Sequence, residues 1–129
     1  MGGRVAKQYL PLAGRPLVAW SLDPLRRAPR IAGCVVALDD DDTTWKATEC
    51  AEFTGVELCP GGAERAASVL AALRFLATHR ADPGDRVLVH DAVRPCLSDD
   101  ALARLLDAGL PDPDGALLAI PVRDTLKSA

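Results

Sequence analysis

A short apolar run, Val87–Val89, is followed directly by His90 and Asp91, with Arg94 and Pro95 closing the segment. An uninterrupted apolar run of this length is typical of a parallel strand that is buried on both faces. Ligands of open α/β sheets bind just outside the carboxyl ends of such strands. The pattern therefore makes Asp91 a candidate metal ligand and Arg94 a candidate anion-binding group, with a capping aspartate and a solvated arginine as the alternative.

Three further apolar runs predict strands, and segments with helical periodicity lie between them. The predicted strands cover residues 33–38, 56–59, 87–90 and 116–120, and the predicted helices cover 16–27, 43–53, 63–79 and 98–109. Pro24 is expected to kink or end the first helix. Ser98 is the expected N-cap of the last helix, with Leu97 and Leu102 spaced as a hydrophobic staple. Because helices alternate with strands, right-handed crossovers predict a mostly parallel α/β sheet with helices on both faces.

Length and charge limit the possible functions. A chain of 129 residues is one domain at most, and its net charge of −3 gives no electrostatic reason to expect a nucleic acid or an anionic membrane as partner. The apolar runs are too short to span a bilayer, and the first residues lack the apolar segment of a signal peptide. The four cysteines have no Cys-x-x-Cys spacing. We interpret Cys34 and Cys59, which lie in or beside predicted strands, as small buried side chains, and we infer a reducing, cytoplasmic setting.

Two polar segments allow two interpretations each. The run Asp39–Asp42 is either a solvated loop that caps the next helix, which we favour, or a metal site. Gly61 and Gly62 stand between a predicted strand and a predicted helix, where a missing Cβ lets a nucleotide approach the backbone and the helix start offers free N–H groups to an anion. A plain turn is the alternative at that position.

Four separated motifs, taken together, resemble the 2-C-methyl-D-erythritol 4-phosphate cytidylyltransferase family in order and spacing. The motifs are Lys7-Gln8-Tyr9-Leu10, Gly61-Gly62-x-x-Arg65-x-x-Ser68-Val69, Val89-His90-Asp91-Ala92-Val93-Arg94-Pro95 and Pro121-Val122-x-Asp124-Thr125-x-Lys127. The resemblance implies a Rossmann-like nucleotidyltransferase fold over residues 1–129. It also implies transfer of CMP from CTP to 2-C-methyl-D-erythritol 4-phosphate, with Mg²⁺ as cofactor. The products would be 4-diphosphocytidyl-2-C-methyl-D-erythritol and pyrophosphate, in non-mevalonate isoprenoid synthesis.

The resemblance also implies roles for single residues on the nucleotide side. Lys7 corresponds to a catalytic lysine that contacts the CTP phosphates. Gly62, Ser68 and Ala92 correspond to residues at the cytidine moiety of CTP.

On the acceptor side, Asp91 corresponds to the metal-binding aspartate and to a substrate contact. Arg94, implied to be catalytic as well, and Thr125 correspond to contacts with the alcohol phosphate. Thr125 would come from the partner of a homodimer. His90 is interpreted as structural, because a phosphate monoester is already ionised near neutral pH and needs no general base.

The chain departs from the family pattern in several places. Ala6 stands where a proline is usual, and Ala63 stands where an acidic residue is usual. An apolar strand and a Gly-rich loop that open the family are absent before residue 1, and later site segments are absent after residue 129. We therefore expect an incomplete copy, with unpaired backbone groups along residues 33–38 and 87–90, that is unstable and weakly active or inactive.

Two other functions remain open from the sequence. One is a cytidylyltransferase for a pentitol phosphate such as ribitol 5-phosphate, and the other is a non-catalytic nucleotide-binding fragment. A dinucleotide-binding oxidoreductase is disfavoured, because no Gly-x-Gly-x-x-Gly follows a predicted strand.

Overall fold

The structure is a computed structural model, and it describes residues 5–121. Its helices, strands and 3₁₀ helices (η) are, in chain order, η1 (Lys7–Tyr9), β1 (Pro11–Leu12), β2 (Arg15–Pro16), α1 (Leu17–Arg27), β3 (Cys34–Leu38), η2 (Trp45–Ala47), η3 (Glu49–Glu52), β4 (Val56–Pro60), α2 (Arg65–His79) and α3 (Asp99–Gly109). None of the helices within this part of the chain has the length and apolar character needed to cross a membrane.

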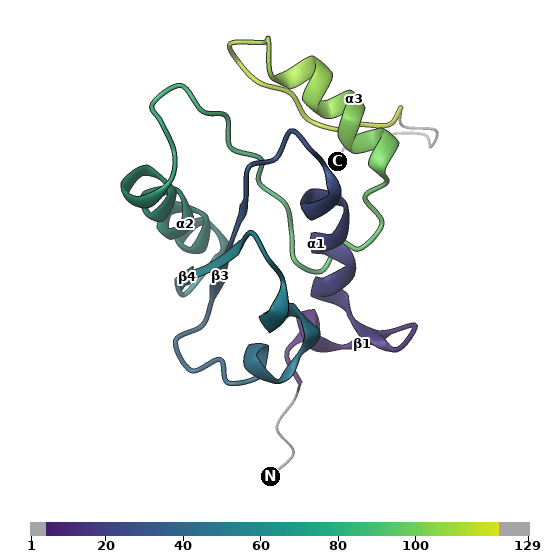
Figure 1. Ribbon diagram of the computed structural model, residues 1–129, viewed down its shortest axis with the longest axis vertical. Coiled ribbons are helices and arrows are strands. Elements are labelled where there is room, and N and C mark those ends of the chain that lie inside the picture. Colours follow the sequence, from purple (N-terminus) through teal and green to yellow (C-terminus); the bar gives the residue numbers. More distant parts are fainter. Residues whose placement is uncertain (1–4, 122–129) are drawn as a thin grey trace, which may run out of the picture.

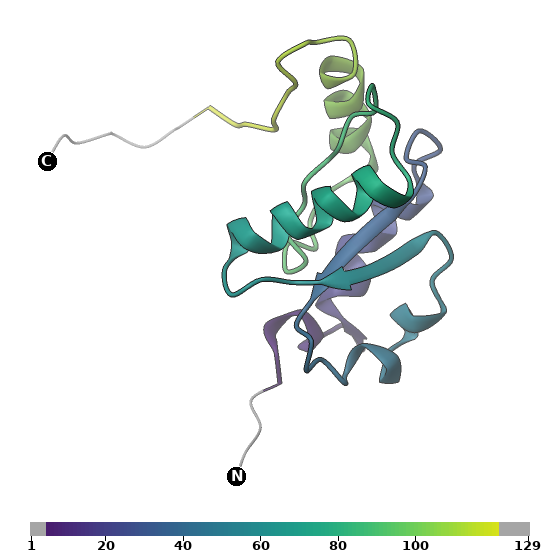
Figure 2. The ribbon, with the colours of Figure 1, turned by 90° about the vertical axis from the view of Figure 1, so that its left-hand side faces the viewer.

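A parallel strand pair lies at the centre of the molecule. β3 and β4 pair in register, from Cys34 opposite Val56 to Leu38 opposite Pro60. α1 lies on one side of this pair and α2 on the other, so three layers follow one another (Figures 1 and 2). The predicted strands at 33–38 and 56–59 and the predicted helices on both faces are therefore confirmed.

The core lies between α1 and the strand pair. Alternate residues of β3 point to opposite faces, and Cys34, Val36 and Leu38 pack on the α1 side. The buried residues of this cluster are Tyr9, Val18, Ala19, Leu22, Trp45 and Cys50. The opposite layer is much more open, because α2 has no fully buried residue. Leu70 of α2 is 46% exposed.

Helix α1 continues through its proline. Pro16, at φ −64°, precedes the first helical residue, and the helix runs to Arg27 with Pro24 inside it. Pro24 therefore does not end the helix, and the hydrogen bond from the Ala28 N–H to the Pro24 carbonyl at 3.2 Å closes its last turn. Pro24 has no N–H to donate to the Trp20 carbonyl, so the helix continues with one backbone hydrogen bond fewer.

The helix predicted over residues 43–53 is wrong. The structure has two short 3₁₀ helices, η2 and η3, in its place. The Asp42 carboxylate accepts hydrogen bonds from the backbone N–H groups of Thr44 and Trp45, at 2.9 and 3.1 Å. The Thr48 hydroxyl donates to the Trp45 carbonyl at 2.8 Å. These local side-chain bonds compete with helical ones and divide the segment into two turns.

The prediction of strands at 87–90 and 116–120 is also wrong, because neither segment pairs with another strand in the described residues. Within residues 5–121, strand pairing joins only β1 with β2 and β3 with β4. A strand needs a second backbone about 4.8 Å away, and no described segment takes that place beside these two stretches. Their apolar side chains remain open to solvent, with Val89 50% and Ile120 88% exposed. Figure 2 shows the stretch after α3 running away from the strand pair.

Helix α3 begins as predicted. The Ser98 side chain accepts a hydrogen bond from the Ala101 N–H at 3.1 Å, and Asp99 and Asp100 lie in the first turn. Leu102 is 1% exposed. An ion pair of 3.0 Å between Arg27 and Asp99 joins α3 to the end of α1.

Candidate functional site

The Gly61-Gly62 segment connects the end of β4 to the start of α2 and lies tightly against both neighbours. The Gly61 N–H donates to the Leu38 carbonyl at 2.6 Å, which carries the loop across the end of β3. A Cβ on Gly62 would collide with the Cβ of Ala67 in α2. The Gly62 N–H donates to the Ser68 hydroxyl oxygen at 3.0 Å. Glycine is therefore required at position 62 by the close approach of the loop to its own helix.

A tight turn at Asp91–Arg94 forms the second part of the site. The Arg94 N–H donates to the Asp91 carbonyl at 3.1 Å, and His90 Nε2 lies 3.1 Å from the Arg94 carbonyl oxygen. The Ser21 hydroxyl of α1 donates to the Ala92 carbonyl at 2.9 Å, and Ser21 is buried. The turn is thus fixed to α1 through its backbone, and the contact of His90 agrees with a structural role.

Two arginines bind the Asp91 carboxylate and join the two parts. Arg65, the first residue of α2, places Nε and Nη2 each 2.9 Å from Oδ1 of Asp91. Arg94 places Nε 2.7 Å from Oδ2. The Arg65 hydrogen bond, helped by the charges of both arginines, lowers the pKa of Asp91. The carboxylate is therefore ionised at neutral pH and held between two cations.

The structure brings most of the predicted site residues together, but not all. Gly62 and Ser68 share one loop-helix junction, which Arg65 connects to Asp91 and Arg94. Ala92 is adjacent in the same turn. Lys7 lies on η1, is exposed, and makes no hydrogen bond or ion pair with Asp91 or Arg94 within the described residues. Thr125 lies outside the described residues.

Sequence reasoning missed two side chains of this site. Arg65 was part of a motif but received no role of its own. The signal that could have found it is an arginine at the positive end of a helix whose first turn holds no acidic residue, because such an arginine needs a negatively charged partner. Ser21 carries no comparable signal, because its partner is a backbone carbonyl 71 residues away.

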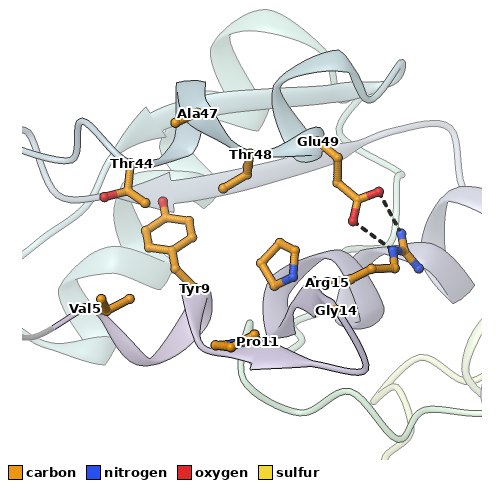
Figure 3. Close-up of a pocket in the computed structure, with 10 residues that line it drawn as sticks. Val5, Tyr9, Pro11, Gly14, Arg15, Thr44, Ala47, Thr48 and Glu49 are labelled. Carbon is orange, nitrogen blue, oxygen red and sulfur yellow. Dashed lines mark hydrogen bonds and ion pairs between the residues drawn. The ribbon is translucent and has the colours of Figure 1, made fainter.

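Two cavities lie elsewhere, and neither is lined by Lys7, Asp91 or Arg94. One, of about 570 Å³, lies between the β1–β2 hairpin and the η2–η3 segment, with Tyr9 at one end and the Arg15–Glu49 ion pair at the other (Figure 3). The second, of about 320 Å³, lies between the end of α1 and α3.

The acidic run beside the larger cavity is a loop-capping segment. The Tyr9 hydroxyl donates to Oδ2 of Asp42 at 2.6 Å, and the Asp41 N–H donates to Oδ1 of Asp39 at 3.0 Å. Burial, with the Asp42 hydrogen bond, raises the pKa of Tyr9. These contacts support the capping interpretation of Asp39–Asp42 over the metal interpretation.

A metal ion at Asp91 would need most of its ligands from a bound molecule. Across residues 5–121, no group of three or more His, Cys, Asp or Glu side chains could hold a metal ion. Mg²⁺ accepts such a site, since it keeps several waters and often takes one or two carboxylates together with phosphate oxygens. The cysteines are free thiols, and burial raises the pKa of Cys34, Cys50 and Cys59.

Comparison with known proteins identifies the family. The family model described as 2-C-methyl-D-erythritol 4-phosphate cytidylyltransferase matches residues 1–129. The chain belongs to this family. Proteins with that name from Halorhodospira halophila and Xanthomonas campestris pv. campestris are each 54% identical to the chain, over 131 and 129 residues. Each alignment covers 99% of the chain but 54% and 48% of the relative. The chain thus spans about half the length of the curated relatives it matches.

A solved structure agrees with the fold of this cytidylyltransferase family. The crystal structure of a 4-diphosphocytidyl-2C-methyl-D-erythritol synthase superposes with a TM-score of 0.87 at 34% identity, covering 96% of this chain and 60% of that one. The fold is therefore the α/β nucleotidyltransferase fold, present here in incomplete form.

Proposed function

We propose that this chain forms part of an enzyme that transfers CMP from CTP to 2-C-methyl-D-erythritol 4-phosphate, releasing pyrophosphate. The observation that carries the proposal is the junction at Asp91. There Arg65 connects the Gly61-Gly62 loop to the turn that holds Asp91 and Arg94. Family membership supports the same chemistry.

The reaction joins two anions, so the site must neutralise charge and hold both substrates. The acceptor phosphate attacks the α-phosphorus of CTP, and the bond from that phosphorus to the pyrophosphate group breaks. Lys7 would bind the CTP phosphates, while Arg94 and Thr125 would grip the acceptor phosphate. Gly62, Ser68 and Ala92 would hold the cytidine. Fixed positive groups of this kind lower the barrier mainly through positioning and charge stabilisation.

Asp91 would hold Mg²⁺ together with the CTP phosphates. The ion would supply charge neutralisation on the phosphates, and one carboxylate suffices as the protein ligand for it. We further propose that the active form is a cytoplasmic homodimer, in which Thr125 reaches the site of the partner.

A chimera tests the proposal most directly. The segment of the Halorhodospira halophila relative that aligns with this chain is replaced by residues 1–129, and pyrophosphate release is measured with CTP and either 2-C-methyl-D-erythritol 4-phosphate or ribitol 5-phosphate. We expect turnover with the first acceptor. Turnover with ribitol 5-phosphate instead would assign the pentitol reaction. CTP binding without pyrophosphate release in the chimera would favour the alternative that the chain is a non-catalytic nucleotide-binding fragment.

A further inference from the structure

Arg65 occupies a position that local physics disfavours. It is the first residue of a helix of 15 residues, with no acidic residue in the first turn. The N-terminal end of a helix carries a partial positive charge, so an arginine there is repelled. Glu64, the N-cap residue, carries one negative charge at this helix end, but the carboxylate that Arg65 itself contacts is that of Asp91, 26 positions further along the chain. Residues that break a local rule in this way often serve function.

The pairing uses two of the three guanidinium nitrogens of Arg65 and engages both oxygens of Asp91. Both contacting nitrogens of Arg65 converge on one oxygen of Asp91, and Arg94 takes the other oxygen. A guanidinium group has five N–H donors in a fork that matches two phosphate oxygens. The Arg65 side chain is 69% exposed, whereas that of Asp91 is 27% exposed. An incoming polyphosphate can therefore reach Arg65 without entering the protein interior.

A cation on Asp91 and the two arginines compete for the same oxygens. Mg²⁺ lies about 2.1 Å from a carboxylate oxygen, and both oxygens of Asp91 already contact a guanidinium group. Placing a doubly charged ion beside two fixed positive charges is unfavourable unless one contact opens. Arg65 is the partner that can leave, because Arg94 belongs to the same short turn as Asp91.

We propose that Arg65 is a phosphate-binding residue and that Asp91 is its ion-pair partner until a phosphate binds. The polyphosphate of the nucleotide replaces Asp91 on Arg65, and the released carboxylate then takes the cation. This proposal rests on the proposed function, and it adds to it a phosphate contact and an exchange between two partners of one arginine. No covalent step is involved.

The test measures metal binding and polyphosphate binding separately on the 129-residue chain. Mn²⁺ alone is titrated by electron paramagnetic resonance, and inorganic tripolyphosphate is titrated by calorimetry in EDTA. Arg65→Gln should tighten Mn²⁺ binding and weaken tripolyphosphate binding, each by about tenfold. Asp91→Asn should weaken Mn²⁺ binding and tighten tripolyphosphate binding. The matched control is Arg74→Gln, which makes the same charge change on the same helix and should leave both affinities unchanged.

The opposite signs separate exchange from a merely structural role. A variant that simply loosens the site would weaken the binding of both ligands. The exchange is therefore overturned if Arg65→Gln changes both affinities in the same direction or changes neither. CTP is then compared with tripolyphosphate. If tripolyphosphate shows the exchange pattern while CTP binds no better and the chimera forms no product, the proposed function fails and the exchange stands. If the chimera is active without that pattern, the proposed function stands and the exchange fails.

Discussion

At the scale of single residues, the site is a balance of charges around one carboxylate. Asp91 is held by Arg65 and Arg94, and these contacts lower its pKa. A carboxyl group whose pKa is depressed on folding contributes stability above its unfolded pKa of about 3.9 and loses that contribution as pH falls through the folded value. The cluster therefore stays intact throughout the neutral range.

We expect the Asp91 carboxyl group to titrate at a lower pH than an ordinary aspartate, because its pKa is lowered, and the ¹³C chemical shift of its carboxyl carbon measures this. In Arg65→Gln, the midpoint should rise toward the ordinary value, because the largest cause of the depression is removed. An unchanged midpoint in that variant would contradict the role of the hydrogen bond.

Gly62 gives a second prediction at this scale. Gly62→Ala places a Cβ against Ala67 and should destabilise the chain by about 1–3 kcal/mol, as overpacking usually does. It should also displace the loop and weaken CTP binding. Gly84→Ala is the matched control, since a Cβ there meets nothing within 4 Å. Urea unfolding of both variants is the measurement, and equal midpoints would refute the steric account.

At the scale of elements, α1 supports the turn that carries Asp91. Ser21→Ala removes the hydrogen bond to the Ala92 carbonyl, and a loss of about 0.5–1.5 kcal/mol is expected, because Ala92 is exposed and water can replace the lost donor. The same variant should weaken Mn²⁺ binding, because the Asp91 turn loses its attachment to α1. A stability loss with unaltered Mn²⁺ affinity would show that the turn holds its shape without α1.

The start of α3 depends on its cap. Ser98→Ala should cost about 1 kcal/mol in urea unfolding, whereas Ser98→Asn retains a capping oxygen and should stay close to wild type. Similar losses in both variants would mean that the Ser98 hydroxyl acts through something other than the Ala101 N–H.

At the scale of the whole molecule, apolar side chains are buried on one face of the strand pair and largely exposed elsewhere. The face that packs on α1 holds the buried cluster, whereas in the segment 87–90 Val87 is 44% exposed and Val89 is 50% exposed. Apolar surface next to backbone without a strand partner favours association between molecules.

We expect the 129-residue chain to self-associate with rising concentration in light scattering, and Val89→Lys to reduce that association. Leu12→Lys, at a similarly exposed apolar position on the β1–β2 hairpin, is the control and should have a much smaller effect. Equal effects of the two variants would point to net charge rather than to the surface around residues 87–90.

The amino-acid order alone located most of the regular elements. Apolar periodicity located α1, α2 and α3, apolar runs located β3 and β4, and the Ser98 cap followed from its position before an acidic first turn. Local patterns misjudged residues 43–53, where Asp42 and Thr48 supply competing hydrogen bonds.

Only the tertiary structure decided the relations between distant segments. Whether residues 87–90 pair as a strand depends on a second backbone beside them, which no property of the run itself reveals. The partner of Arg65 is likewise set by how α2 packs against the turn at Asp91, because an ion pair forms where folding brings the charges together. Local sequence fixes conformation over a few residues, while charge pairing and strand pairing depend on distances that exist only in the folded chain.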